Sequence, residues 1–567
     1  MTNTPWRRRD DALAAGGFFG LAVLTYAPML LFDRLLVNAD VFLAYLPAHL
    51  WLAEGLRAGE LWLWAPHLLT GFPLAFTEYG WFYPPTWLAL LVAPGPRGYW
   101  LAVALHAATA GIAAYVLARS WGRTPAAAGI AGATYQVSGT VAGGAALLNF
   151  GTVFWALPFL FWCVDGLRRA ASSRGQIAWQ SFVLRSLLAS TAVGLVALSG
   201  HPQLVALVCL GAGAYAIVTT TAMTRSGGWR LWIAPAALLS GGLGAAPLAA
   251  IRILPTLEVA ALSPRGQELE AASAVVGSAL PWALVAGLAL PGLEVLPVLS
   301  PTWVAYVGIV PLVLAFYAIW QMREASVPSR TVLLLATGLA GLILALGVFT
   351  PLYPLLLHVP GFALFRDPTR WLILWVFAVA MLASEGYDAW RGTVGARRTV
   401  PRPNGRRWPR LALLSVVVIV AGSLIGAVAL ILGRSVLVEQ VGAPLAQRLA
   451  ADSTRTFSAE RYEITFAAYL TQAQRALDPR QLAVLGPLAG LVLAVWWSRS
   501  QREHAAVTLS VVTVPLLLFM WSRFPTVPPG VGADELARVA ALPGFREGTS
   551  RLLSWKPLAA AYELNLA

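Results

Sequence analysis

The sequence predicts an all-α integral membrane protein, a polytopic bundle of about thirteen transmembrane helices. Of its 567 residues, 58% are hydrophobic and only 12% are charged, against roughly 25% charged in an ordinary soluble domain. Apolar runs such as 331–348 and 411–432 contain no charge and reach the ~20 residues that a helix needs to cross a bilayer. The first run, 13–32, follows Arg7, Arg8 and Arg9 and is too long for a signal peptide, so we expect it to be retained as a span.

The arginines predict the orientation of these spans. The net charge of +14 is concentrated at the ends of apolar runs, and the segment 391–410 holds seven arginines and no acid. Under the positive-inside rule this places the N-terminus in the cytoplasm and the C-terminus outside, and it disfavours nucleic acid as a partner. The expected spans lie near 13–33, 99–118, 125–145, 150–167, 181–199, 203–223, 231–252, 302–322, 331–349, 371–390, 411–432, 481–498 and 505–522.

The first extracytoplasmic loop is expected over 34–98, with a helix over 41–56 and many Trp and Tyr residues suited to a membrane interface. Within it the apolar segment 81–93 is too short to cross the bilayer and fits a re-entrant or interfacial helix. Further outside segments are expected over 253–301, 350–370 and 433–480. The tail after 522 has a short helix at 533–542 and resembles either an outside domain cut short or a docked amphipathic tail.

Several enzyme and transporter classes find no support in the sequence. There is no phosphate-binding Gly-rich loop ending in Gly-Lys-Ser/Thr, and Lys556 is the only lysine. Neither a His-Glu-x-x-His run nor a cysteine cluster indicates zinc. Cys163 and Cys209 both lie inside apolar spans, which disfavours a disulfide framework. The acids lie mostly in the loops predicted outside, whereas a transporter is expected to bury ionisable groups in mid-span.

Asp40 follows the first span and is the leading candidate for catalysis. A carboxylate at the membrane surface can accept the proton of an incoming hydroxyl group, as a general base does. The alternative is that Asp40 is the N-cap of the helix expected over 41–56, because Asp is favoured there. The residues alone leave both alternatives open.

Four groups of short motifs resemble, in order, the YfhO-like membrane proteins of the GT-C glycosyltransferase superfamily. The similarity covers residues 10–395 well and the remainder weakly. The motifs are Asp40 with Leu-Arg-Ala-Gly-Glu-Leu-Trp-Leu-Trp-Ala-Pro at 56–66, Gly71-Phe72-Pro73 and Phe82-Tyr83-Pro84; Gly200-His201-Pro202-Gln203; Pro255-Thr256-Leu257-Glu258 with Ser263-Pro264-Arg265; and Phe365-Arg366-Asp367-Pro368-Thr369-Arg370. Ala39 stands before the Asp where better-known relatives have Gly.

The resemblance implies a GT-C-like fold in a bacterial plasma membrane. It further implies inverting transfer of a sugar from a polyprenyl-phosphate donor to an extracytoplasmic cell-envelope polymer, glycolipid or protein, with Asp40 as general base. Membrane lipids are the other expected partners. The resemblance implies no particular cofactor and leaves a divalent metal open. The division of the chain is then a catalytic module over 1–395, additional helices over 396–522, and the tail over 523–567. The alternative function is a transporter or flippase of lipid-linked saccharides without glycosyl-transfer chemistry.

The same motifs supply the candidate substrate-binding residues, each of which has a structural alternative. His201 and Gln203 stand where a phosphate or sugar contact is expected, or else in a plain polar turn. Arg366 and Arg370 share one face if the stretch is helical and are expected to hold the departing phosphate; the alternative is an ion pair with Asp367, or snorkelling. The remaining three candidates, for which a structural role weighs more, are Glu78, Glu258 and Arg265.

Overall fold

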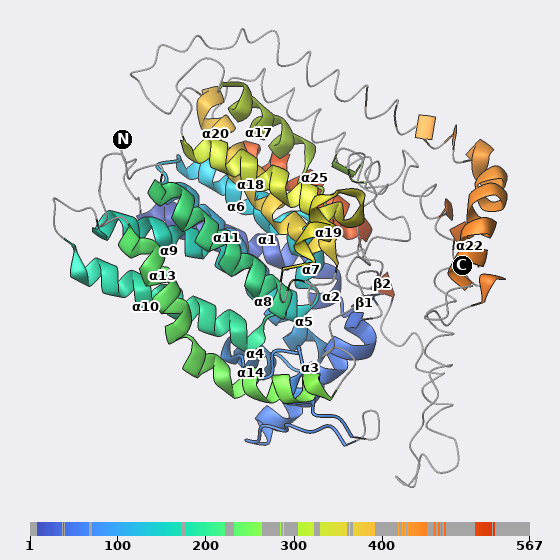
Figure 1. Ribbon diagram of the computed structural model, residues 1–567, viewed down its shortest axis with the longest axis horizontal. Helices are drawn as coiled ribbons and strands as arrows, with labels where there is room; N and C mark the ends of the chain where they lie inside the picture. The colour runs from blue at the N-terminus through green and yellow to red at the C-terminus, as the bar shows by residue number, and fades with distance from the viewer. Residues whose placement is uncertain are drawn as a thin grey trace. The chain divides into compact units, whose positions relative to one another are not determined.

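The computed structural model (Figure 1) describes residues 8–36, 38, 40–66, 71–171, 177–221, 232–262, 304–321, 329–359, 362, 367–391, 431–450, 505–523 and 526–527, with scattered positions in 284–288, 418–429 and 458–471. The chain forms two compact units, each assembled from segments far apart in sequence. Unit 1 comprises Met1–Phe18, Ala110–Gly144 and Glu268–Arg523. Unit 2 comprises Phe19–Thr109, Ala145–Gln267 and Phe524–Ala567.

Five helices among the described residues are long and apolar enough to cross a membrane, as expected for a multi-pass membrane protein. Each coincides with a span predicted from the sequence. They are Pro96–Ser120 (α5), Leu148–Ala171 (α8, Leu148–Phe154, and α9, Ala156–Ala171), Trp179–Ser199 (α10), Pro202–Thr221 (α11) and Pro368–Arg391, which begins with the 3₁₀ turn η9 (Pro368–Trp371) and continues as α20 (Leu372–Arg391).

A sixth candidate span is bent. Helix α13 (Ile233–Gly244) is followed by α14 (Ala246–Ala261), and the two axes differ by 55° across the break at Ala245. The predicted span 231–252 is therefore two helices. The second helix runs nine residues past the predicted end, from 252 to 261, and that extension carries residues of the candidate site.

Other predicted spans are shorter or interrupted, so the count of about thirteen is not confirmed. The first contains α1 (Arg8–Thr25) and α2 (Ala27–Leu30), and the third is broken into α6 (Pro125–Val137) and α7 (Gly139–Ala145). The break occurs where Ser138 is extended, and its hydroxyl oxygen accepts a hydrogen bond from Val141 N at 3.3 Å. Three spans appear as α17 (Ile309–Gln321), α18 (Ser329–Ala345) and α25 (Ala505–Arg523). The spans predicted at 411–432 and 481–498 fall mostly or wholly outside the described residues.

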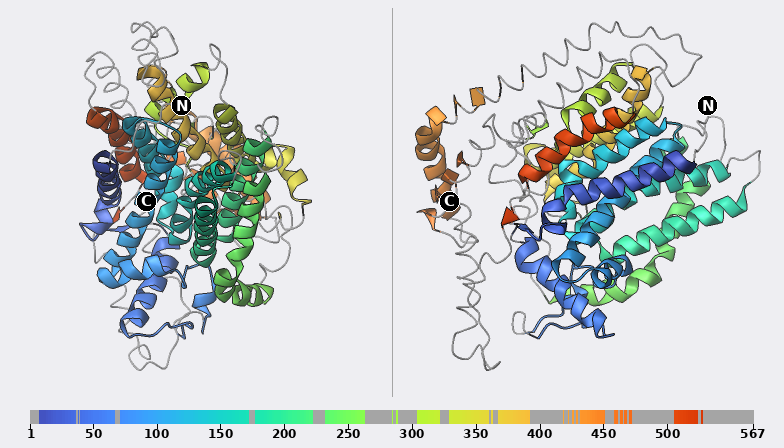
Figure 2. Two further views of the ribbon diagram at one scale, coloured as in Figure 1. Left: turned by 90° about the vertical axis from the view of Figure 1, so that its left-hand side faces the viewer. Right: turned by 180° about the vertical axis from the view of Figure 1, so that it is seen from behind.

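In unit 1, α20 packs against α6, α17 and α18, and α25 packs on α6 (Figures 1 and 2). Gly386 makes the close approach of α20 to α17 possible, because a Cβ atom there would collide with the backbone carbonyl of Leu314. Small residues at such crossings allow membrane helices to pack by backbone contact. A short helix, α19 (Leu352–Leu356), follows the 3₁₀ turn η7 (Gly347–Phe349); a π-helical turn at Val438–Gly442 leads into α22 (Ala443–Ala450).

Asp388 joins α20 to the start of α6. Its fully buried carboxylate accepts hydrogen bonds from Thr124 N at 3.1 Å and from Thr124 Oγ1 at 2.6 Å. The same hydroxyl oxygen accepts from Ala127 N at 3.3 Å and so caps α6. Both donors of Thr124 are therefore satisfied by a residue 264 positions away.

We expect Asp388→Ala to lower the free energy of unfolding by about 3 kcal/mol, because two hydrogen bonds to a charged acceptor are lost and the Thr124 donors are left buried. Asp388→Asn, which keeps the side-chain shape and one acceptor, should lose about half as much. Thermal unfolding of the detergent-solubilised protein measures both. An Asp388→Ala variant that unfolds at the wild-type temperature would contradict this role.

In unit 2, α9 packs against α10, α11 and α13, and α10 also packs against α14; these helices are the green group in Figure 1. Asp165, buried in α9, accepts a hydrogen bond from Tyr215 Oη at 2.9 Å and forms an ion pair with Arg168 at 3.5 Å. In the same unit, β1 (Leu35–Leu36) pairs antiparallel with β2 (Thr526–Val527), Leu35 opposite Val527.

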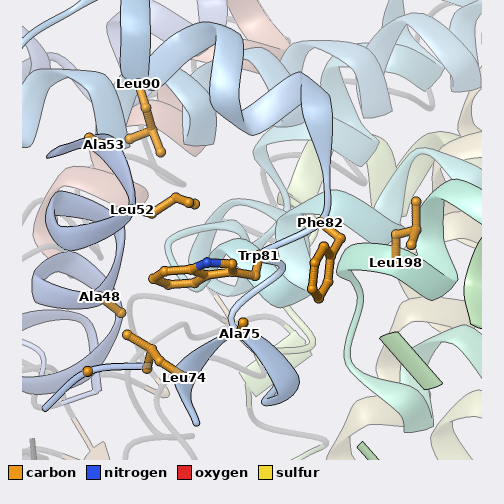
Figure 3. Close-up of a cluster of buried hydrophobic side chains, with 10 residues drawn as sticks. Ala48, Leu52, Ala53, Leu74, Ala75, Trp81, Phe82, Leu90 and Leu198 are labelled. Atoms are coloured by element: carbon orange, nitrogen blue, oxygen red, sulfur yellow. The ribbon is translucent and has the colours of Figure 1, made fainter. Parts of the chain in front are cut away.

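The segment 34–98 contains helices, as predicted, while the side of the membrane on which it lies stays a prediction. A π-helical turn, η1 (Val41–Tyr45), leads into α3 (Leu46–Arg57), and the short α4 spans Pro84–Val92. The wider turn suits Pro47, which has no N–H to donate to the preceding turn. Trp81 is buried among side chains of α3, including Leu52, and of the 3₁₀ turn η2 (Leu74–Phe76), as Figure 3 shows. This packing fixes the loop that carries Glu78.

The predicted division into modules 1–395, 396–522 and 523–567 stays a prediction, and the tail helix expected at 533–542 falls outside the described residues.

Candidate functional site around Glu78, His201 and Arg252

Asp40 begins the helical segment but does not cap it. Its backbone is already helical (φ −64°, ψ −44°), and its side chain makes no capping hydrogen bond. Asn38 Oδ1 instead accepts from Val41 N at 3.1 Å. A capping residue must have non-helical backbone angles to turn its side chain toward the first free amides, which excludes Asp40. The N-cap alternative is therefore wrong, and the Asp40 carboxylate is exposed.

Glu78 and His201 come together in unit 2. Glu78 follows η2, His201 lies in the turn between α10 and α11, and Glu78 Oε2 is 3.2 Å from His201 Nε2. The side chains are 32% and 17% exposed, so a ligand can reach the pair. His201 Nδ1 accepts from Gln203 N at 3.3 Å, which assigns the proton of the neutral ring to Nε2, facing the carboxylate.

The turn that carries His201 is held on two sides. His201 N donates to Asn149 O at 2.9 Å, and the imidazole lies 5.2 Å from the ring of Phe150, both in α8. Gly80 approaches the end of α10 so closely that a Cβ atom would lie 3.3 Å from Ser199 O, and its φ of +72° also favours glycine. These contacts bring loop 77–80 and turn 200–203 to one place.

Arg252 lies beside this turn and was not predicted. It is 4% exposed, and its Nη1 donates to Ala197 O at 2.6 Å and Gly200 O at 2.9 Å, the carbonyls at the C-terminal end of α10. A cation is favourable there because the free carbonyls carry partial negative charge. Arg252 Nε is buried without a hydrogen-bond partner among the described residues. Glu78 acts on this guanidinium electrostatically and supplies the opposite charge.

The sequence did contain a signal for Arg252. It is an arginine within an apolar stretch, and an ionisable group in such a stretch is a candidate for function by default. The sequence predicts that the span ends at 252, and an arginine at the end of a span is unremarkable. The structure continues the helix to Ala261, where Thr256 Oγ1 donates to Phe76 O at 2.8 Å and ties α14 to the loop of Glu78.

Tyr45 connects Asp40 with this cluster. The buried phenol lies edge-on to Tyr79, with ring centroids 5.0 Å apart. Burial raises the pKa of Tyr45 well above its ordinary value, and the nearby negative charges of Glu78 and Asp40 raise it further. The two carboxylates therefore act on the same hydroxyl group, which stays protonated and able to donate.

The remaining predicted residues are Glu258, Arg265, Arg366 and Arg370. Glu258 is exposed on α14, and Arg265 and Arg366 lie outside the described residues. Arg370 forms the ion pair that was its structural alternative, with Nε 3.7 Å from Asp367 Oδ2. Burial raises the pKa of Asp367, and Arg370 opposes that shift. Within the described part of the chain, no group of three His, Cys, Asp or Glu side chains could hold a metal ion.

His49, in the segment 34–98, makes the free energy of unfolding depend on pH. It is buried in α3, with Nδ1 2.7 Å from Tyr45 O, and burial lowers its pKa to about 4 against the opposing effect of backbone hydrogen bonds. Because the folded pKa is below the unfolded value of about 6.5, the unfolded chain binds more protons between these pH values. The stability contributed by neutral His49 is complete above about pH 6.5 and is lost as the pH falls toward 4.

We therefore expect the free energy of unfolding to fall by about 3 kcal/mol between pH 7 and pH 4 through this residue. His49→Phe should remove most of that dependence, and the exposed His358→Phe should leave it unchanged. Unfolding curves across this pH range measure both. Equal pH dependence in wild type and His49→Phe would refute the assignment.

Comparison with known proteins identifies no family. No protein-family description matches the sequence, and no curated protein sequence matches it. The chain is similar to the crystal structure of ArnT from Cupriavidus metallidurans in the apo state, at 14% identity over 93% of this chain and 79% of that chain, with a TM-score of 0.46. A similarity of this size carries no argument about fold or activity, and the YfhO-like resemblance is not confirmed by it.

Proposed function

We propose that the chain is a membrane glycosyltransferase of the GT-C type. It transfers a sugar from a polyprenyl-phosphate donor to an extracytoplasmic acceptor, with inversion at the anomeric carbon. The observation that carries the proposal is the carboxylate of Asp40, which is exposed at the start of a helical segment while Asn38 does the capping. The motifs that resemble YfhO-like proteins support it.

The reaction is a single displacement. The acceptor hydroxyl oxygen attacks the anomeric carbon while Asp40 takes its proton. A new glycosidic bond forms as the bond between the anomeric carbon and the phosphate oxygen breaks, and polyprenyl phosphate leaves with that electron pair. Attack from the face opposite the leaving group inverts the anomeric carbon.

Two described acids inside candidate spans are fully buried, Asp165 in α9 and Asp388 in α20. Both lie within the last two turns of their helices and are paired with Tyr215 and Thr124. They act as links between helices and give no reason to prefer the transporter alternative. What separates the functions is the product, since an enzyme makes a new glycoside and a flippase only moves its substrate.

The purified protein in liposomes, supplied with radiolabelled polyprenyl-phosphate sugars and a mixture of envelope-derived acceptors, tests the proposal. We expect label to move from the lipid to a new glycoside. Movement of intact labelled lipid between leaflets without a new glycoside would replace the proposal with the flippase.

The proposed topology has its own test. With the N-terminus in the cytoplasm and the C-terminus outside, a cysteine at position 95 should react with an impermeant thiol reagent in intact cells. A cysteine in loop 391–410 should react only after the membrane is opened. Labelling of both positions from the same side would refute this topology.

A further inference from the structure

We propose that Glu78, His201, Arg252 and Asn149 form a subsite for a neutral, polyhydroxylated sugar ring. The inference rests on the proposed function and adds to it the chemical class of the group that is held. It also assigns that role to residues other than Asp40.

Unpartnered buried atoms point to a ligand. Asn149 is 1% exposed, yet neither its Oδ1 nor its Nδ2 has a hydrogen-bond partner among the described residues. Arg252 Nε is also buried without a hydrogen-bond partner among these residues. At least about nine in ten buried polar groups in folded proteins are paired. The backbone carbonyl of Asn149 accepts a hydrogen bond from His201 N, and Arg252 Nη1 donates one to the carbonyl of Gly200. The unpartnered atoms, Oδ1 and Nδ2 of Asn149 and Nε of Arg252, therefore belong to two residues that flank one turn.

The hydrogen-bond donors and acceptors of these four side chains suit the hydroxyl groups of a sugar. A carboxylate accepts from hydroxyls, an amide both donates and accepts, and a guanidinium N–H donates, so together they can satisfy both functions of a sugar hydroxyl. Glu78 and His201 are partly exposed, so the ring can reach them, while the rings of Tyr79 and Phe150 lie beside them. Aromatic rings suit the apolar face of a sugar.

Charge favours a neutral ring over an ion. The carboxylate of Glu78 is already compensated by Arg252 and by the Nε2–H of His201. A cationic substituent on the ligand would gain little from a compensated carboxylate. A phosphate would meet the negative charge of Glu78 at the accessible edge of the cluster, so the anionic part of the donor is expected elsewhere.

The test is binding to the full-length protein in nanodiscs. The probes are bare polyprenyl phosphate, the same lipid carrying glucose, galactose, mannose or glucosamine, and the soluble oligosaccharide maltotriose. We expect wild type to bind at least one neutral hexose lipid about 10-fold or more tightly than the bare lipid. Glu78→Gln should weaken that binding by about 10- to 100-fold, as loss of a charged hydrogen bond does, and leave binding of the bare lipid unchanged. Glu54→Gln, an exposed carboxylate on α3, is the matched control.

Asn149→Leu gives a second readout that a structural role would not produce. Replacing an unpaired buried amide by an apolar side chain of similar size should raise the melting temperature, while a subsite residue should lose hexose-lipid binding at the same time. If Glu78→Gln does not fold, the Asn149→Leu variant alone tests the sugar subsite. Unchanged binding of both the hexose lipids and maltotriose in Asn149→Leu would overturn the inference.

The remaining outcomes are also distinct. A loss confined to maltotriose would support the same subsite with the acceptor as its ligand. Equal weakening of bare and glycosylated lipid by Glu78→Gln would overturn the subsite and leave the proposed function standing, as would a preference for glucosamine. Wild type that binds none of the lipids would overturn both.

Discussion

Asp40→Asn is expected to lower the turnover of glycosyl transfer by a factor of about 10² to 10⁴, the usual loss on removing a general base. Asparagine keeps the size and the exposed position of the side chain but cannot take a proton from the acceptor hydroxyl. Donor binding should change little, because the carboxylate is assigned to the acceptor. Single-turnover rates with lipid-linked sugar, measured beside the dissociation constant of the donor, separate the two quantities.

Two variants control for structural effects. Asn38→Ala removes the actual cap of the helical segment and should cost about 1 kcal/mol of stability without removing the base. Glu54→Gln removes an exposed carboxylate from α3 and should leave turnover unchanged. Near-normal turnover of Asp40→Asn in protein shown to be folded and inserted would remove Asp40 from the mechanism.

Arg252→Met is expected to lower the free energy of unfolding by about 3 to 5 kcal/mol, since the carbonyls of Ala197 and Gly200 lose a buried charged donor and Glu78 loses its compensating charge. The turn of His201 should loosen as well. Arg252→Lys keeps the charge but replaces the planar fork by a point cation, so an intermediate loss is expected. Thermal unfolding in detergent measures the series.

Arg57 provides a matched control for Arg252. Its Nη2 donates to Leu90 O at 2.5 Å and Ala93 O at 3.3 Å, the carbonyls at the end of α4, but the side chain is exposed. Arg57→Met should therefore cost only about 0.3 to 1 kcal/mol, the range for an exposed cation at a helix C-terminus. Similar losses in Arg57→Met and Arg252→Met would show that burial does not set the size of the effect.

The sequence by itself determined the helical, membrane-spanning character of the chain and the position of five spans. Hydropathy and charge suffice for this because a helix satisfies its own backbone in lipid, so crossing depends on a local run of about 20 apolar residues. The helix predicted over 41–56 and the short helix within 81–93 also followed from local patterns, and the structure ends the first at Arg57. Local patterns failed where a helix bends, at Ser138 and Ala245. At the first bend the freed amides are satisfied from outside the helix ladder, because Val141 N donates to Ser138 Oγ and Gly139 N donates to Tyr306 O.

Only the tertiary structure decided which polar residues meet. Glu78, His201 and Arg252 are separated by 123 and 51 positions in the chain (201 − 78 and 252 − 201), and no periodicity relates them. The assignment of the cap to Asn38 rather than Asp40 likewise depends on which residue first adopts helical backbone angles. The physical reason is the same in both cases: burial and hydrogen bonding of a polar side chain depend on what packs around it, whereas membrane crossing depends on the composition of one continuous segment.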